Sequence, residues 1–238
     1  MDVAQTADHI DDELRAAAHP ERAEKERAYL KSDLVHYGVS VPDIRRVAKA
    51  ALRDQGPVGH DDLIALVETL WAEPVHERRM ACVELLDAGG AVLGPDDMTL
   101  LERLLREART WAIVDGLAAS VAGALVDREP TAAAVLDRWA VDDDFWIRRS
   151  ALLVLLVPLR RGAGDFDRFG RYADGMLEET EFFIRKAIGW VLRDTGRKRP
   201  EMTYEWLLPR AHRASGVTIR EAIKPLSDTQ RAAILAAR

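Results

Sequence analysis

The sequence predicts an all-α fold, an α-solenoid of HEAT-like helix pairs, and three observations carry this prediction. Alanine, leucine, arginine and glutamate are abundant, whereas aromatic residues make up only 6% of the chain. Runs that alternate polar and β-branched residues, which are typical of half-buried strands, are missing. Helix-forming segments are separated by glycine and proline at short intervals, and some of them repeat about every 35 residues.

Glycine and proline mark the expected ends of the helices, because proline lacks a backbone N–H and glycine destabilises a helix interior. The expected helices cover residues 7–18, 21–31, 42–53, 60–71, 75–88, 95–107, 110–126, 130–139, 143–160, 166–177, 180–195, 200–209, 217–225 and 227–237. Neither a Gly/Ser-rich linker nor a shift in composition marks a domain boundary. We therefore expect one solenoid domain over residues 1–238, in which residues 1–27 form an acidic helical segment.

The helical segments repeat. WIRRSA at 146–151 resembles FIRKAI, which begins 37 residues later, and TIREAI follows after another 35, while HERRMA at 76–81 lies about two periods upstream. Because each helix pair buries its apolar face only against its neighbours, the second helices would line one concave surface. Equivalent positions carry Arg79, Arg149, Lys186 and Arg220. Such a ladder of cations on one surface favours binding of a polyanion, although each cation alone is typical of a solvated helix surface.

Composition restricts the class of protein. The net charge of −6 argues against a general nucleic-acid binder, but residues 1–27 alone carry eight acids against four bases, and residues 147–161 carry four arginines and no acid. The only cysteine is Cys82, and the six histidines lack ligand spacing, so we expect no disulfide, metal or cofactor. Without a secretory signal or an apolar run of membrane-spanning length, a cytoplasmic monomer with no membrane partner is expected.

The stretch at 110–126, TWAIVDGLAASVAGALV, is predicted to be one buried helix with two exceptional residues. Trp111 and Asp115 are four residues apart, so an indole and a carboxylate lie on the same helical face. A carboxylate beside an apolar helix is costly to desolvate unless a cation or a hydrogen-bond donor meets it. Asp115 could therefore pair with an arginine of a neighbouring helix while Trp111 fills the core, or the two could form a site.

The same spacing recurs further along the chain, since Lys186 and Trp190 are also four residues apart. If a solenoid aligns these helices, Trp111, Asp115, Arg149 and Trp190 meet in the middle of the concave face. Two indoles and one carboxylate around a gap would hold a flat cation, because each cation–π contact contributes about 0.5–2 kcal/mol. Arginines beside them would hold phosphates without reading a base sequence.

Three motifs together closely resemble the DNA alkylation repair enzymes, the AlkD family of DNA glycosylases. They are WAIVD at 111–115, FWIRR at 145–149 and EFFIRKAIGWVLR at 181–193, and weaker similarity extends the resemblance to about residues 25–230. The resemblance implies a HEAT-like solenoid that wraps duplex DNA. It also implies excision of cationic N-alkylated purines, such as 3-methyladenine and 7-methylguanine, for base excision repair, without a deep base-flipping pocket. A shallow site of this kind would also admit bulky adducts.

The resemblance also assigns roles to residues. It identifies Asp115 as the catalytic aspartate, Trp111 and Trp190 as the tryptophans of the catalytic site, and Arg149 and Arg193 as DNA contacts. Tyr29 matches a tyrosine near the lesion. With the cationic ladder and its neighbour, the expected DNA-binding residues are Tyr29, Arg79, Arg148, Arg149, Lys186 and Arg193. One departure is Val157, where the family carries a basic residue.

Glycosidic chemistry agrees with these roles. An N3- or N7-alkylated purine is already a cationic leaving group, and its departure places positive charge on the sugar. A fixed carboxylate stabilises that charge and can orient the attacking water, while indole faces favour the cation. Two other classes stay open: a solenoid that binds DNA by its shape without cutting, and a protein-interaction scaffold. A carboxylate between two tryptophans favours the glycosylase.

Overall fold

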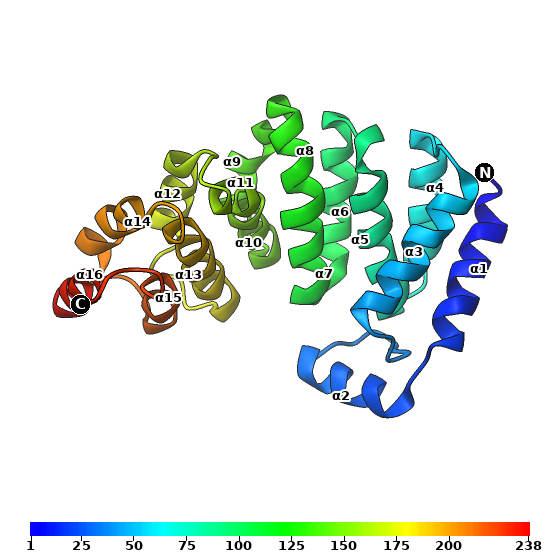
Figure 1. Cartoon of the computed structure of the whole chain (residues 1–238), viewed down its shortest axis with the longest axis horizontal. Helices are drawn as coiled ribbons and strands as arrows, with labels where there is room; N and C mark the ends of the chain where they lie inside the picture. Colours follow the sequence, from blue (N-terminus) through cyan, green and yellow to red (C-terminus); the bar gives the residue numbers. More distant parts are fainter. The chain divides into compact units, whose positions relative to one another are not determined.

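The computed structural model describes residues 1–238, which form helices and loops and no β-strand, so the predicted all-α class is confirmed. The only β-type pairing is an isolated parallel bridge between Val35 and Val75. None of the helices combines the length and the apolar character that crossing a membrane requires. The helices follow one another in short, packed segments (Figure 1), as a helical-repeat fold requires.

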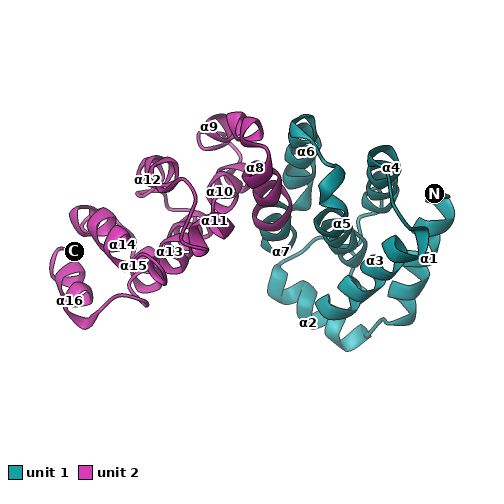
Figure 2. Cartoon of the chain, turned by 45° about the horizontal axis from the view of Figure 1, so that its top comes forward, with its two compact units in different colours: residues 1–117 teal, residues 118–238 magenta.

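The chain forms two compact units, Met1–Leu117 and Ala118–Arg238 (Figure 2). The helices of the first unit are α1 (Val3–Ala16), α2 (Pro20–Leu30), α3 (Val41–Gln55), α4 (His60–Trp71), α5 (His76–Gly89), α6 (Met98–Ala108) and α7 (Trp111–Asp115). Those of the second are α8 (Gly123–Arg128), α9 (Leu136–Trp139), α10 (Phe145–Leu153), α11 (Leu156–Arg160), α12 (Phe166–Gly175), α13 (Phe182–Gly196), α14 (Pro200–Leu207), α15 (Gly216–Ala222) and α16 (Asp228–Ala236). A single continuous solenoid domain stays a prediction.

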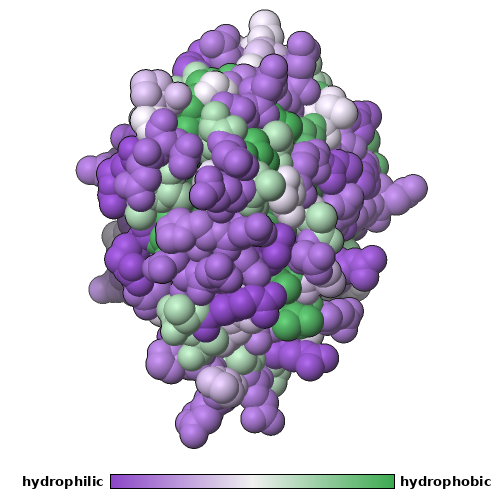
Figure 3. Space-filling model, turned by 90° about the vertical axis from the view of Figure 1, so that its right-hand side faces the viewer, coloured by the Kyte–Doolittle hydropathy of each residue, from purple (hydrophilic) through white to green (hydrophobic).

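In the N-terminal unit, α5 packs against α3 and α4, and α1 covers all three. The acidic segment therefore contains a core helix, because Ile10 and Leu14 of α1 are fully buried. Most of its acids are exposed, and the face of the unit that carries α1 is mostly hydrophilic (Figure 3). Helix α2 lies apart from this stack (Figure 1), and Leu30 is its only buried residue. The two expected helices of the acidic segment thus have different environments.

The loop at 31–40 between α2 and α3 is fixed by a buried carboxylate. Glu77 is fully buried, and its oxygens accept hydrogen bonds from the backbone N–H groups of Tyr37 at 2.9 Å, Gly38 at 2.6 Å and Val39 at 3.2 Å. Gly38 has φ +82°, and a Cβ atom there would lie 2.2 Å from the backbone oxygen of His19. Only glycine permits this approach, which attaches the start of α2 to the loop.

In the C-terminal unit, α13 is the central helix and packs against α10, α11, α14 and α15. The expected helix at 143–160 is interrupted between α10 and α11. Pro158 cannot donate a backbone hydrogen bond to the Val154 oxygen four residues earlier, so the helix breaks there. A Cβ atom at Gly123 would lie 2.9 Å from this oxygen, so glycine lets α8 approach the break.

The expected helix at 110–126 forms, but it is not α-helical throughout. Residues Gly116–Ala122 adopt a π-helix between α7 and α8. Gly116 lies against Val83 of α5, where an added Cβ atom would be 2.7 Å from a methyl carbon. The expected helix at 130–139 likewise begins as a 3-10 helix, Pro130–Val135.

Candidate functional site

Trp111 and Asp115 are the first and last residues of α7. Both are half-buried, whereas Ile113 and Val114 between them are fully buried. The helix therefore presents the indole and the carboxylate on its accessible side, one turn apart. The π-helix starts directly after Asp115, and π-helical turns occur frequently at functional sites.

Tyr29 lies against Trp111 in the same unit. It is 73% exposed, and its ring contacts the indole edge-on, with centroids 5.8 Å apart and an interplanar angle of 85°. Such an arrangement is favourable between aromatic rings. The structure thus brings together two residues that are 82 positions apart in the sequence.

Two exposed cations flank these aromatic residues in the sequence. Lys31 and Arg109 follow α2 and α6, and both adopt left-handed backbone conformations, with φ values of 49° and 52°. This conformation is uncommon for residues other than glycine, and here it forms the C-terminal caps of the two helices. Sequence reasoning missed both, because the signal is in the backbone rather than in a motif.

Arg79, expected to contact DNA, is half-buried and bound to groups of the protein. Its guanidinium lies 4.8 Å from the ring centroid of Trp71 and donates a hydrogen bond of 2.7 Å to the backbone oxygen of Glu107. Burial lowers the pKa of Arg79. The arginine borders a cavity of about 360 Å³ that Arg106 and Arg109 also line.

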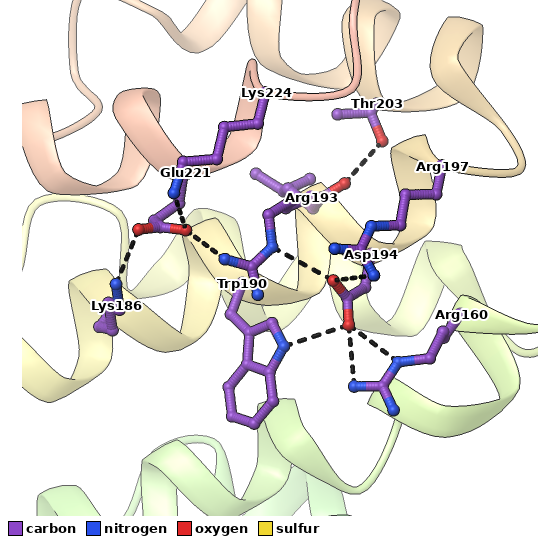
Figure 4. A network of polar contacts seen from close by, with 10 residues as sticks. Arg160, Lys186, Trp190, Arg193, Asp194, Arg197, Thr203, Glu221 and Lys224 are labelled. Carbon is purple, nitrogen blue, oxygen red and sulfur yellow. Dashed lines mark hydrogen bonds and ion pairs between the residues drawn. The ribbon is translucent and has the colours of Figure 1, made fainter.

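In the C-terminal unit, Trp190 is held by an aspartate one turn further along α13 (Figure 4). The indole Nε1 donates a hydrogen bond of 3.1 Å to Oδ2 of Asp194, which is only 2% exposed. Arg160 of α11 donates to the same oxygen through Nε at 2.8 Å. Asp194 thus fixes the indole, and the four-residue spacing was a signal that sequence reasoning missed.

Lys186 and Arg193 converge on Glu221 of α15 (Figure 4). The ammonium of Lys186 lies 2.7 Å from Glu221 Oε1, Arg193 donates to Oε2, and Lys224 donates to the same oxygen at 2.9 Å. Burial by itself would raise the pKa of Glu221, but the hydrogen bonds from Lys186 and Lys224 outweigh it, so that the pKa falls to about 2.

The ion-pair network around α13 has a net positive charge. It joins two carboxylates, Asp194 and Glu221, with five cations, which are Arg160, Lys186, Arg193, Arg197 and Lys224. An excess of cations attracts a polyanion even when individual members are paired.

Arg148 and Arg149 of α10 bind groups in the first turn of α13 and in the loop before it. Arg148 donates two hydrogen bonds, of 2.9 and 2.8 Å, to the carboxylate of Glu179, which raises its pKa. Arg149 is only 2% exposed and donates to the backbone oxygen of Phe183. In contrast, Arg220 of α15 is exposed, so the cations of the ladder have unequal environments.

Val157 stands where the family carries a basic residue, and the two arginines that follow it, Arg160 and Arg161, are both paired with carboxylates. Val157 is half-buried, and Arg160, one turn later, is paired with Asp194. Arg161 is more exposed, at 68% of its side chain, and lies 3.7 Å from Asp127. Arg161 is therefore the better placed of the two to contact a polyanion.

Trp111, Asp115 and Tyr29 belong to the N-terminal unit, whereas Arg149 and Trp190 belong to the C-terminal unit. Within the units, Tyr29 contacts Trp111, and Trp190 and Arg193 both donate to Asp194, whereas Arg79 and Arg149 donate to backbone oxygens of the protein. That these residues share one concave face stays a prediction.

Comparison with known proteins agrees with the motifs. The family model described as DNA alkylation repair enzyme matches residues 10–226. No curated protein sequence matches the chain. The fold is similar to a solved structure described as a "Predicted DNA alkylation repair enzyme from Enterococcus faecalis", with a TM-score of 0.79 and 23% identity over 89% of this chain and 97% of that one.

Two structures from Streptococcus mutans have the same fold at lower similarity. One is AlkD2, with a TM-score of 0.62 and 16% identity over 86% of this chain and 99% of that chain. The other, described as smu.31 from strain UA159, has a TM-score of 0.61 and 16% identity over 87% of this chain and 98% of that chain.

Proposed function

The chain belongs to the DNA alkylation repair enzyme family, and we propose that it is a DNA glycosylase for cationic N-alkylated purines in duplex DNA. Its substrates would include 3-methyladenine and 7-methylguanine, and an open site would also admit bulky adducts. The observation that carries the proposal is the half-buried pair of Trp111 and Asp115 on α7, with Tyr29 edge-on to the indole.

In the proposed reaction, the bond between C1′ and the purine nitrogen breaks, and its electron pair neutralises the alkylated base. The sugar passes through an oxocarbenium-like state, which the negative charge of Asp115 stabilises. A water molecule oriented by the same carboxylate adds its oxygen to C1′ and releases a proton. The products are the free base and an abasic sugar. The indole faces of Trp111 and Trp190 would favour the cationic base and sugar.

DNA binding in this proposal relies on phosphate contacts. Lys186 and Arg193 stand in a network with a positive balance, where a phosphate could share the cations that now surround Glu221. Arg148 and Arg149 would act mainly by fixing the surface, because both already bind protein groups. Lys31 and Arg109 add exposed cations near Tyr29 and Trp111 in the chain.

The decisive experiment measures release of 7-methylguanine from methylated duplex DNA in single turnover, with DNA binding measured in parallel. Asp115→Asn keeps the shape of the side chain but removes its charge, so we expect the rate to fall about 100- to 1000-fold while binding changes little. Trp111→Ala and Trp190→Ala should cost less, because each removes one aromatic face. The matched control is Asp54→Asn at the end of α3, which removes the same charge from an exposed position.

The other two classes of function are outcomes of the same experiment. If the wild-type protein binds duplex DNA but releases no base, it is a non-catalytic protein that binds DNA by its shape. If it does not bind DNA even at low salt, the result favours the interpretation as a protein-interaction scaffold. Base release by Asp115→Asn at the wild-type rate would make Asp115 a structural carboxylate.

A further inference from the structure

Three side chains from three elements of the N-terminal unit meet outside the site described above. They are Glu26 of α2, His36 of the loop at 31–40, and His76, the first residue of α5. One potential ligand atom of each lies within 4.8 Å of those of the other two. The imidazole rings are stacked, with centroids 4.5 Å apart and an interplanar angle of 11°. Forty residues separate the two histidines, so their spacing in the sequence gave no sign of this cluster.

The backbone brings the two histidines together. Val35 and Val75 form a parallel bridge, in which the N–H of Val35 donates to the oxygen of Pro74 and the N–H of His76 donates to the oxygen of Val35, both at 2.9 Å. The residues that follow the bridge on each segment are His36 and His76, so their side chains emerge next to each other on one side. Glu77 then binds the N–H groups after His36, which fixes the register of the two segments. The backbone therefore holds the two imidazole rings next to each other.

The polar atoms of this cluster are buried and unsatisfied. The side chains of His36 and Glu26 are 1% and 18% exposed, and His76 is 2% exposed. Both ring nitrogens of His36, Nδ1 of His76 and Oε2 of Glu26 have no hydrogen-bond partner. His36 Nδ1 lies 3.8 Å from Glu26 Oε2, which is beyond hydrogen-bond distance. Buried polar atoms without partners are rare and require an explanation, and here four of them lie in one cluster.

The donor set suits a metal cation. Imidazole nitrogens and a carboxylate oxygen are ligands that transition-metal ions bind, and the four atoms without partners supply both kinds.

We propose that Glu26, His36 and His76 form a binding site for a divalent transition-metal ion, for which Zn²⁺ is the best fit. Two imidazoles and one carboxylate are a known ligand set for Zn²⁺, with water in the fourth position. At metal–ligand distances of about 2.0–2.2 Å, tetrahedral ligand atoms lie roughly 3.4 Å apart. To bind one ion, the ligand atoms, which now lie within 4.8 Å of one another, must move closer. Because the two rings are stacked, one imidazole must also rotate about its Cβ–Cγ bond so that both nitrogen lone pairs point at the ion, while the long Glu26 side chain moves in. Glu26 also lines an open groove with His19, Arg22, Lys25 and Tyr29, which gives the ion a path from solvent.

The bound ion would attach α2 to the rest of the N-terminal unit. Apart from Leu30, this helix buries no residue, yet it carries Tyr29, three residues after Glu26 and in contact with Trp111. A metal ion that joins α2 to the loop and to α5 fixes the helix and thereby the tyrosine. The positioning of Tyr29 for catalysis rests on the proposed function, whereas metal binding does not.

The test uses the full chain after removal of metal with a chelator. Calorimetric titration with Zn²⁺ should show one site, and Zn²⁺ at about 100 times Kd should raise Tm by roughly 5–10 °C. Glu26→Gln and His36→Gln should each weaken Kd by at least about 10-fold, because losing a ligand costs no less than losing its supporting group. Co²⁺ in place of Zn²⁺ should give the visible absorption of a tetrahedral site, which these two variants should lose.

Two controls separate this site from adventitious binding. Glu24→Gln removes a charge from the same helix at an exposed position, and His60→Gln removes a surface histidine that lies 2.9 Å from Asp97. Both should bind Zn²⁺ like the wild type, and circular dichroism should show that every variant is folded. The proposal is overturned if the wild-type protein binds no Zn²⁺ at micromolar concentration, or if binding is lost in His60→Gln and kept in Glu26→Gln. Zn²⁺ binding without base release would refute the proposed function alone.

Discussion

Replacing Asp194 by asparagine tests how the protein holds Trp190. Asp194 is 2% exposed and accepts hydrogen bonds from Trp190 at 3.1 Å, from Arg160 at 2.8 Å and from Arg193 at 3.2 Å. Asparagine has nearly the same size, but one of its two terminal groups is a donor. At least one of the three donors around it therefore loses its acceptor.

The magnitude follows from these contacts. Removing one partner of a buried charge pair costs about 3–5 kcal/mol. The side chains of Arg160 and Arg197 are 43% and 60% exposed, so water can replace part of what they lose. The indole that loses its acceptor contributes about 1 kcal/mol. We therefore expect the free energy of unfolding to fall by roughly 2–4 kcal/mol.

Urea unfolding, followed by tryptophan fluorescence and circular dichroism, measures this change. Glu205→Gln is the control, because it removes one charge from an exposed position in the same unit. We also expect slower release of 7-methylguanine by Asp194→Asn, though less so than by Asp115→Asn, since the indole remains present but is no longer fixed. A stability within about 0.5 kcal/mol of the control would refute the claim that Asp194 anchors the network around α13.

Two further predictions concern charge. Glu221 has a depressed pKa of about 2 in the folded state, so the stability it contributes is fully present above its unfolded pKa of 4.5 and is lost as pH falls from 4.5 toward 2. Because the side chains of Lys186 and Lys224 are 40% and 55% exposed, water screens these ion pairs, and we expect this contribution to be on the order of 1–2 kcal/mol. Urea unfolding at pH 6 and pH 3 should show a smaller acid loss in Glu221→Gln than in the wild type, and equal losses would contradict the assignment. Duplex affinity should fall with salt by about 0.9 log units per log unit of salt for each phosphate neutralised. Arg109→Gln or Lys31→Gln should reduce that slope by about one phosphate, whereas the exposed Arg53→Gln on α3 should not; an unchanged slope in all three would remove Lys31 and Arg109 from the DNA contacts.

The sequence alone determined what depends on neighbours along the chain. Composition and the positions of glycine and proline predicted the all-α class and most helix ends. The four-residue spacing predicted that Trp111 and Asp115 share a helical face, because the period of an α-helix fixes which side chains point the same way. Three motifs identified the family, since they preserve residue types at fixed spacings. Each of these inferences needs only one helix or one contiguous segment.

The tertiary structure decided which segments that are distant in the sequence contact one another. The burial of Arg149, the edge contact of Tyr29 with Trp111 and the meeting of His36 with His76 each join segments that are tens of residues apart. Even Asp194, one turn from Trp190, acquires its role from Arg160 of another helix. A periodic pattern gives the face on which a side chain lies, but the groups opposite that face are set by packing between elements. The chemistry of a buried charge or imidazole depends on those groups, because desolvation makes the presence or absence of a partner decisive.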